Sequence, residues 1–171
     1  MIDDLSPRLL VDGMLGRLAK WLRILGYDTE YEAHLDDNEL VRRSRAEGRW
    51  LLTRDHELAG RPGLHSLLVD GDQLGDQIRQ VRSELGPGTG RAFSRCPVCN
   101  ATLVATSAQE VRDRVPPFVL HSHRRFHRCP SCDRVYWPGS HWKRMRELLA
   151  QLEERNEGPH PSKEPRGDAG S

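Results

Sequence analysis

The sequence lacks several features that would place it in well-defined protein classes. No apolar run in its 171 residues approaches the roughly 18 residues that a membrane-spanning helix needs. The opening segment MIDDLSPRLLVDG has no basic stretch followed by an apolar one, so we expect no secretory signal. Neither a G-x-S-x-G turn nor a Walker-type loop occurs. We therefore expect a cytoplasmic protein that binds no membrane and is neither a serine hydrolase nor a P-loop enzyme.

Aromatic residues and lysine are both scarce. Phe, Trp and Tyr make up 6% of the chain, and its mean hydropathy is −0.69. The lysines are Lys20, Lys143 and Lys163. A receiver-type phospho-acceptor domain would share an early acid and a strand-end aspartate near position 55, but it also needs a lysine at the end of a later strand. Because no lysine stands at such a place, we disfavour that class.

All four cysteines belong to one pattern, in which two C-P-x-C turns are separated by 29 residues. Two C-x2-C pairs supply four thiolates, which complete the tetrahedral shell of a structural zinc ion. The alternatives are two disulfides in a secreted protein, or a redox C-x-x-C, which rarely occurs as a matched pair. A closed thiolate shell leaves no open coordination position, so we expect this zinc to be structural. The predicted ligands are Cys96, Cys99, Cys129 and Cys132.

Charge is distributed unevenly along the chain, although the net charge is only +1. Residues 1–90 carry 12 basic and 16 acidic side chains, a net charge of 12 − 16 = −4. Residues 91–150 carry 11 basic and 4 acidic side chains, a net charge of 11 − 4 = +7. An acidic module beside a basic one suggests metal-binding or catalytic carboxylates in the first and a polyanion-binding surface in the second.

Apolar runs alternate with helical patterns in the first half of the chain, which predicts an α/β fold with a mainly parallel sheet and flanking helices. The predicted strands cover residues 8–12, 27–31, 50–53 and 66–70, and the predicted helices cover 15–25, 36–48 and 72–85. A small zinc module, with a hairpin or loop in its spacer, and a helix over 141–154 follow. We predict a first domain over 1–85, a Gly-rich linker over 86–95, a zinc module with its helix over 96–154, and a disordered tail over 155–171.

Carboxylates follow several of the predicted strands. Asp12, Asp55 and Asp70 each come after an apolar strand, and Asp37, flanked by Asp36 and Glu39, opens the second helix. The carboxyl ends of parallel strands share one edge of the sheet, where ligands bind. Acids clustered there would repel one another unless a hard cation such as Mg²⁺ or Mn²⁺ neutralised them. Alternatively, such aspartates are ordinary helix caps and turn formers.

Several segments resemble the Mut7-C RNase-like family, over roughly residues 8–150. They are LLVDGMLGRLAKWLRILGYDT, DDNEL, WLLTRDHEL, CPVCN and CPSCDRVYWPGSHWKRM. The resemblance implies a PIN-like nuclease fold, a C-terminal zinc ribbon with the four cysteines as its ligands, and a ribonuclease that uses divalent metal. It also implies that Asp12 and Asp55 are the first and third metal-binding acids. We take Asp37 as the second, with Glu39 as its rival, and Asp70 or Asp72 as a fourth.

The second module contains the basic surface that would bind RNA. Residues 121–128 hold three arginines, three histidines and Phe126, which either stacks on a base or fills the small core. The histidines are interpreted as surface groups, and residues 136–142 are expected to pack the last helix onto the ribbon. The candidate nucleic-acid-binding residues are Arg17, Lys20 and Arg54 near the acids, and Arg124, Arg125, Arg128, Lys143 and Arg144 in the second module.

These observations favour a divalent-metal-dependent endoribonuclease in which a structural zinc ribbon binds RNA, either single-stranded or structured. The alternative is a nucleic-acid-binding or adaptor protein whose PIN-like domain is inert. A third possibility is a protein-interaction scaffold in which zinc serves only folding. The sequence contains no signal for an oligomeric state.

Overall fold

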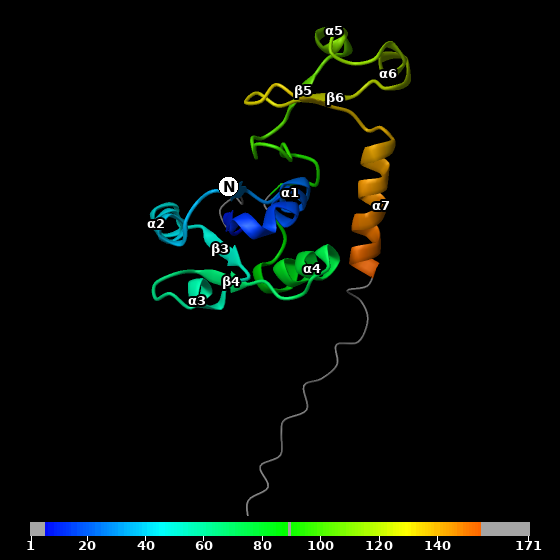
Figure 1. Cartoon of the computed structure of the whole chain (residues 1–171). Coiled ribbons are helices and arrows are strands. Elements are labelled where there is room, and N and C mark those ends of the chain that lie inside the picture. The colour runs from blue at the N-terminus through cyan, green and yellow to red at the C-terminus, as the bar shows by residue number, and fades with distance from the viewer. Residues whose placement is uncertain (1–5, 89, 155–171) are drawn as a thin grey trace, which may run out of the picture.

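A four-stranded parallel sheet forms the centre of the first half of the molecule. The computed structural model describes residues 6–88 and 90–154 (Figure 1), so the predicted tail lies outside the described residues. The strand order is β2-β1-β3-β4, and every neighbouring pair is parallel. This confirms the predicted parallel α/β fold. The strands are β1 (Leu9–Val11), β2 (Thr29–Tyr31), β3 (Trp50–Thr53) and β4 (Ser66–Leu68).

Helices cover both faces of the sheet because its central strands are apolar throughout. In β1, Leu9 and Val11 pack into one core, whereas Leu10 packs into the core on the opposite face. The first core is closed by α1 (Gly16–Ile24) and α4 (Leu74–Leu85), and the second by α2 (Asp37–Glu47) and α3 (His56–Ala59). The single-turn helix α3 was not predicted, because four residues are too few to show a helical period.

Glycines mark helix ends and one close approach of the backbone. Gly48 ends α2 with φ +62°, and Gly26 follows α1 with φ +93°, as the sequence predicted. A Cβ on Gly26 would lie 2.3 Å from the carbonyl oxygen of Gly90. The predicted linker therefore runs against the end of α1, and the Gly90 N–H donates to the Gly26 carbonyl at 3.1 Å.

The ribbon, defined here as residues 91–139, contains an antiparallel sheet of order β5-β6-β7. Its strands are β5 (Val104–Thr106), β6 (Phe126–Arg128) and β7 (Val135–Tyr136). The spacer between the cysteine pairs contains β5 and β6 and, between them, two short helices, α5 (Ala108–Val111) and α6 (Pro117–Ser122). Ser107 and Glu110 form a capping box on α5, and Pro117 opens α6. These local signals explain helices where we had expected only a hairpin or loop.

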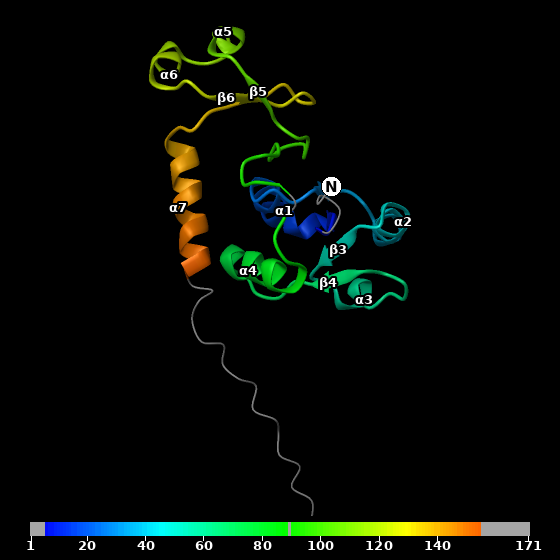
Figure 2. The ribbon, with the colours of Figure 1, turned by 180° about the vertical axis from the view of Figure 1, so that it is seen from behind.

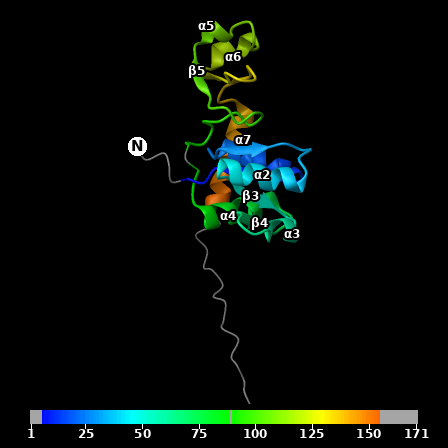
Figure 3. The ribbon, with the colours of Figure 1, turned by 90° about the vertical axis from the view of Figure 1, so that its left-hand side faces the viewer.

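The last helix, α7 (Ser140–Glu154), packs its buried leucines on the sheet module. Here the sheet module means residues 6–88. Leu149 and Leu152 belong to the core that α1 and α4 close, and Figures 1 and 2 show α7 running from the ribbon to the side of both helices. The expectation that α7 packs onto the ribbon holds at its start, where the Trp142 ring lies 4.7 Å from the ring of Phe93, but the buried leucines in its distal half pack on the sheet module. Figure 3 shows the ribbon at one end of the molecule, with α7 leading back from it.

Within the described ranges, no helix combines the length and apolar character that crossing a bilayer requires.

Candidate functional site

The carboxyl edge of the parallel sheet collects the ends of all four strands. The chain leaves β1 toward β2 on one side and later returns to β3 on the other, so the connections reverse direction between β1 and β3. Crevices at such a switch point are where open parallel sheets bind ligands. Asp12 directly follows β1, and Asp55 comes two residues after β3. These two acids therefore flank the switch point.

Thr53 links the two acids. Its side chain is fully buried at the end of β3, and its hydroxyl donates to Asp12 Oδ2 at 2.7 Å. The oxygen of this Thr53 hydroxyl in turn accepts from the backbone N–H of Asp55 at 3.0 Å. One hydroxyl thus sets the orientation of the Asp12 carboxylate and the backbone that carries Asp55. We had not singled out Thr53, although its place between a buried strand and an acid in LLTRD was a usable signal.

Asp55 also caps α3 through only one of its carboxylate oxygens. Oδ1 accepts from the backbone N–H groups of Glu57 at 2.7 Å and Leu58 at 3.0 Å. Asp12 Oδ1 and Asp55 Oδ2 make no hydrogen bond within residues 6–88 and 90–154. Each acid therefore has one oxygen available for a cation, and oxygen is the donor that Mg²⁺ and Mn²⁺ prefer. Asp55 can therefore cap α3 with one carboxylate oxygen and bind a metal with the other.

The segment after Asp12 is held against the end of β2. The Tyr31 hydroxyl donates to the Gly13 carbonyl at 3.0 Å, and a Cβ on Gly13 would lie 2.9 Å from the carbonyl oxygen of Ala33. Met14 follows in a short 3₁₀ turn (Gly13–Leu15) with 77% of its surface exposed. A fixed turn with an exposed thioether thus borders the Asp12 side of the edge.

The other predicted acids lie near the same edge but have different neighbours. Asp37 lies 3.8 Å from the Arg61 guanidinium, and Glu39 pairs with Arg42. Asp72 accepts from Arg54 at 2.8 Å, and Asp70 is exposed. Across the described chain, the cysteines alone form a group of three or more metal-ligand candidates whose donor atoms all lie within 4.8 Å of one another. The structure therefore links Asp12 with Asp55 through Thr53, and among the described residues no such hydrogen-bonded link joins Asp37, Glu39, Asp70 or Asp72 to them.

The four cysteines converge on one centre in the ribbon. Sγ–Sγ distances are 3.6 Å for Cys96 and Cys132 and 3.3 Å for Cys99 and Cys129. A disulfide needs about 2.05 Å, whereas a tetrahedral zinc with bonds of about 2.3 Å places its sulfurs about 3.8 Å apart. All four thiols are free of disulfides. The donor set and its spacing fit a structural metal such as zinc, as the sequence predicted.

The two cysteine turns have the same backbone geometry. Asn100 and Asp133 directly follow the second cysteine of each pair, with φ values of +69° and +62°. Their N–H groups donate to the carbonyls of Cys96 at 2.9 Å and Cys129 at 3.0 Å. Outside the turns, the Tyr136 hydroxyl lies 3.1 Å from Cys96 Sγ, where it can donate to a thiolate. Burial and this sulfur contact raise the pKa of Tyr136, so its proton is retained.

The first cysteine turn docks onto the edge strand of the sheet module. Asn100 Oδ1 accepts from the backbone N–H of Thr29 in β2 at 2.9 Å, and Asn100 Nδ2 donates to Asp28 Oδ1 at 2.8 Å. From α1, the buried Arg23 donates to the carbonyls of Val98 at 2.9 Å and Pro97 at 3.2 Å. This side-chain docking was missed, because nothing local in the sequence indicates that the residue after a cysteine turn binds a distant strand.

Asp28 is the charged centre of this docking contact. Its carboxylate also accepts from Arg49 Nη1 at 2.9 Å, and Arg49 is itself almost completely buried. Burial raises the pKa of Asp28, but hydrogen bonds from Arg49 and Asn100 outweigh that effect and hold the pKa below its ordinary value. The ionised form of Asp28 therefore favours the contact between the two modules.

The predicted basic residues of the ribbon are exposed, but its aromatic candidate is not. Phe126 is 1% exposed and packs with Val111 and Val119, which confirms the core interpretation and leaves it unable to stack on a base. Phe118 on α6 is instead 69% exposed. Arg124 and Arg125 are exposed and form no ion pair with another described residue, whereas Arg128 shares Asp133 with Arg114. The remaining candidates Arg17, Lys20, Lys143 and Arg144 are exposed on α1 and α7.

A family model described as Mut7-C RNAse domain matches residues 7–149, which includes both modules and most of α7. No curated protein and no solved structure matches the chain.

Proposed function

The chain belongs to the Mut7-C RNAse domain family, and we propose that it is a divalent-metal-dependent endoribonuclease that hydrolyses RNA at the carboxyl edge of its parallel sheet. The family description supports a ribonuclease-type function. The observation that carries the mechanism is the pair Asp12 and Asp55, joined through the buried hydroxyl of Thr53 at the switch point of the sheet.

In the proposed mechanism each residue has a separate task. Asp12 and Asp55 hold the cation through the oxygens that make no internal hydrogen bond, and Thr53 keeps Asp12 oriented. A divalent ion at such a site supplies a Lewis acid that activates water and neutralises phosphate charge. Asp37 at the start of α2 is the third proposed ligand. To bind the cation, its carboxylate must move away from the Arg61 guanidinium. Asp70, Asp72 and Glu39 are further candidates at the same edge.

The ribbon is proposed to bind the RNA. Arg124 and Arg125 offer unpaired charge for phosphates, and the exposed ring of Phe118 offers a face for an unpaired base. The cysteine cluster holds a structural metal in this proposal and takes no part in the reaction, because four thiolates leave no open position.

The test is cleavage of a fluorescent RNA with Mg²⁺, with Mn²⁺ and with EDTA. We expect cleavage only with metal, and we expect Asp12→Asn and Asp55→Asn to lower the rate by at least about 100-fold, because losing even a supporting group of a metal site costs about 10–100-fold. Asp113→Asn, an exposed acid of the ribbon, is the matched control and should cleave like the wild type. Metal-independent cleavage, or full activity in both edge variants, would contradict the mechanism.

A second candidate function is favoured by the ion pairs at the edge. Asp37 lies 3.8 Å from Arg61, Glu39 pairs with Arg42 and Asp72 pairs with Arg54, so three of the predicted acids already have cationic partners. This arrangement suits a nucleic-acid-binding or adaptor protein without catalysis. RNA binding that weakens steeply with salt, with no turnover under any divalent metal, would select it. Absence of RNA binding at low salt would favour the protein-interaction scaffold instead.

A further inference from the structure

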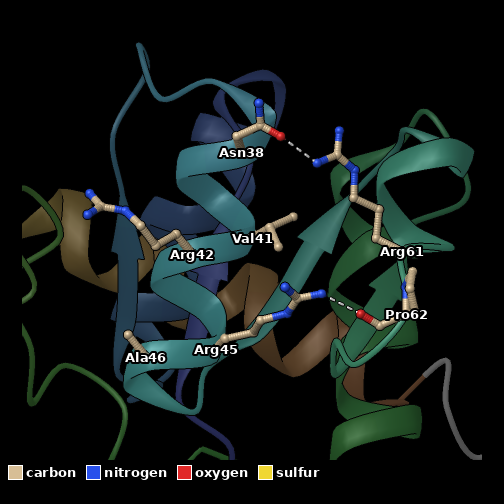
Figure 4. A pocket seen from close by; sticks show the side chains of 7 residues that line it. All are labelled: Asn38, Val41, Arg42, Arg45, Ala46, Arg61 and Pro62. Atoms are coloured by element: carbon tan, nitrogen blue, oxygen red, sulfur yellow. Dashed lines mark hydrogen bonds between the residues drawn. The ribbon is translucent and has the colours of Figure 1, made fainter.

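An arginine-lined groove lies between α2 and the segment that follows α3 (Figure 4). Its volume is about 610 Å³, and three of its seven lining residues are arginines. Arg45 comes from α2 and Arg61 from beyond α3, and both side chains point into the groove, whereas Arg42 lines it from α2 but its side chain points to the other side of that helix. The other lining residues are Asn38, Val41, Ala46 and Pro62.

Two of the arginines, Arg45 and Arg61, are oriented by hydrogen bonds across the groove. Arg45 Nη2 donates to the Pro62 carbonyl at 2.5 Å, and Arg61 Nη1 donates to Asn38 Oδ1 at 2.8 Å. Both acceptors are neutral. The acidic neighbours are Glu39, which pairs with Arg42, and Asp37, which lies 3.8 Å from Arg61. The ion pair of Arg61 with Asp37 is exposed and contributes little, so a phosphate can replace that carboxylate.

The groove starts at the candidate active edge and leads away from it. In Figure 4 the strand arrow points toward the end with Asn38 and Arg61, and Arg45 and Pro62 lie at the other end. Asn38 and Arg45 are seven residues apart on α2, which is about 10 Å along the helix axis. That length matches about three stacked nucleotides. The apolar side chains of Val41 and Pro62 give the groove surface that riboses can contact.

We propose that this groove binds the phosphodiester backbone of a single RNA strand as it leaves the acidic edge, with Arg45 and Arg61 as phosphate ligands. The inference rests on the proposed function, because the RNA strand is assumed to run from the acidic edge of the sheet into the groove. A planar guanidinium matches phosphate geometry, and a groove between one helix and one loop offers contacts to one backbone rather than to a duplex. With the ribbon, the groove beside α2 would form a second RNA-binding surface.

The experiment measures binding of a short, unstructured, fluorescent RNA in EDTA by anisotropy, between about 50 and 200 mM salt. The variants are Arg45→Gln and the double variant Arg45→Gln/Arg61→Gln. The control is Arg79→Gln, which removes an arginine of an i,i+3 ion pair on α4, outside the groove. We expect the double variant to lose about ten-fold in affinity and its salt slope to fall by about 1.4, at about 0.7 for each lost phosphate contact. Arg79→Gln should keep the wild-type slope.

Wild-type affinity in the double variant would overturn the groove proposal, and so would an affinity loss without a smaller salt slope. Tighter binding of poly-glutamate than of RNA would also overturn it, by identifying an acidic peptide as the ligand. The binding assay needs no cleavage, so the two proposals fail separately. Cleavage that depends on Asp12 together with unaffected groove variants would contradict only the groove. A groove-dependent salt slope without any cleavage would contradict only the proposed function.

Discussion

The four cysteines of the ribbon already have their donor atoms within 4.8 Å of one another, whereas the acids of the sheet edge are linked only as the pair Asp12 and Asp55. Each cysteine pair sits on one short turn, and thiols can lose their protons to a metal as it binds. The carboxylates come from separate strands and repel one another when close. The difference indicates that local turns preassemble the four-cysteine site, whereas no local turn brings the acids of the sheet edge together.

The largest expected effect concerns the ribbon and comes from removing the metal. Cys129→Ser or a strong chelator should unfold residues 104–106 and 126–128, because structural zinc contributes about 10 kcal/mol or more and the ribbon core is small. Hydrogen exchange should show these amides unprotected while Leu9–Val11 stays protected. Protection of both sheets in the metal-free protein would mean that packing alone holds the ribbon.

The next effect tests how the acidic edge is assembled. Thr53→Val keeps the side-chain shape but removes the hydroxyl that joins Asp12 to the Asp55 backbone. We expect RNA cleavage to fall about 10–100-fold, as for loss of a group that orients a metal ligand. Thr53→Ser retains a hydroxyl and should recover most of the rate. Equal rates for Val and Ser would show that the link has no part in activity.

A smaller effect separates the two cysteine turns, which share a geometry but not a docking role. Asn100→Gly tolerates the positive φ but leaves the buried Thr29 N–H without its partner, at a cost of about 2 kcal/mol in the free energy of unfolding. Asp133→Gly makes the same backbone change in the second turn and loses only exposed ion pairs, so we expect about 1 kcal/mol or less. Denaturant unfolding of the zinc-loaded variants measures both. Equal losses of unfolding free energy in Asn100→Gly and Asp133→Gly would contradict the docking role of Asn100.

The smallest effect is the pH dependence of the docking contact. Because the folded-state pKa of Asp28 lies below its ordinary value of 3.8, the ionised form stabilises the folded protein. This contribution is complete above that ordinary value and is lost as pH falls through the folded-state pKa. Asp28→Asn should therefore show a shallower loss of unfolding free energy on acidification below about pH 4 than the wild type. Parallel pH profiles would contradict the ion-dependent contact.

Much of the fold could be predicted because it follows from periodicity along the chain. The apolar strands and the helices that follow them were predicted within a few residues, and Gly26 and Gly48 mark helix ends as expected. The helices α3, α5 and α6 were missed because each has six residues or fewer, too short for a hydrophobic period to show. The edge that holds Asp12 and Asp55 followed from the parallel sheet, but the Thr53 link did not.

The sequence by itself determined the parallel α/β fold and the four-cysteine centre. Both depend on spacing between near neighbours, which the covalent chain sets directly. Only the tertiary structure decided which ring is exposed, burying Phe126 and leaving Phe118 at the surface. It also decided that α7 packs on the sheet module, that Asn100 hydrogen-bonds to β2, and that Arg61 and Arg45 line the same groove. These contacts join residues far apart in the sequence, and they form only because burying apolar surface in the core fixes where each element packs.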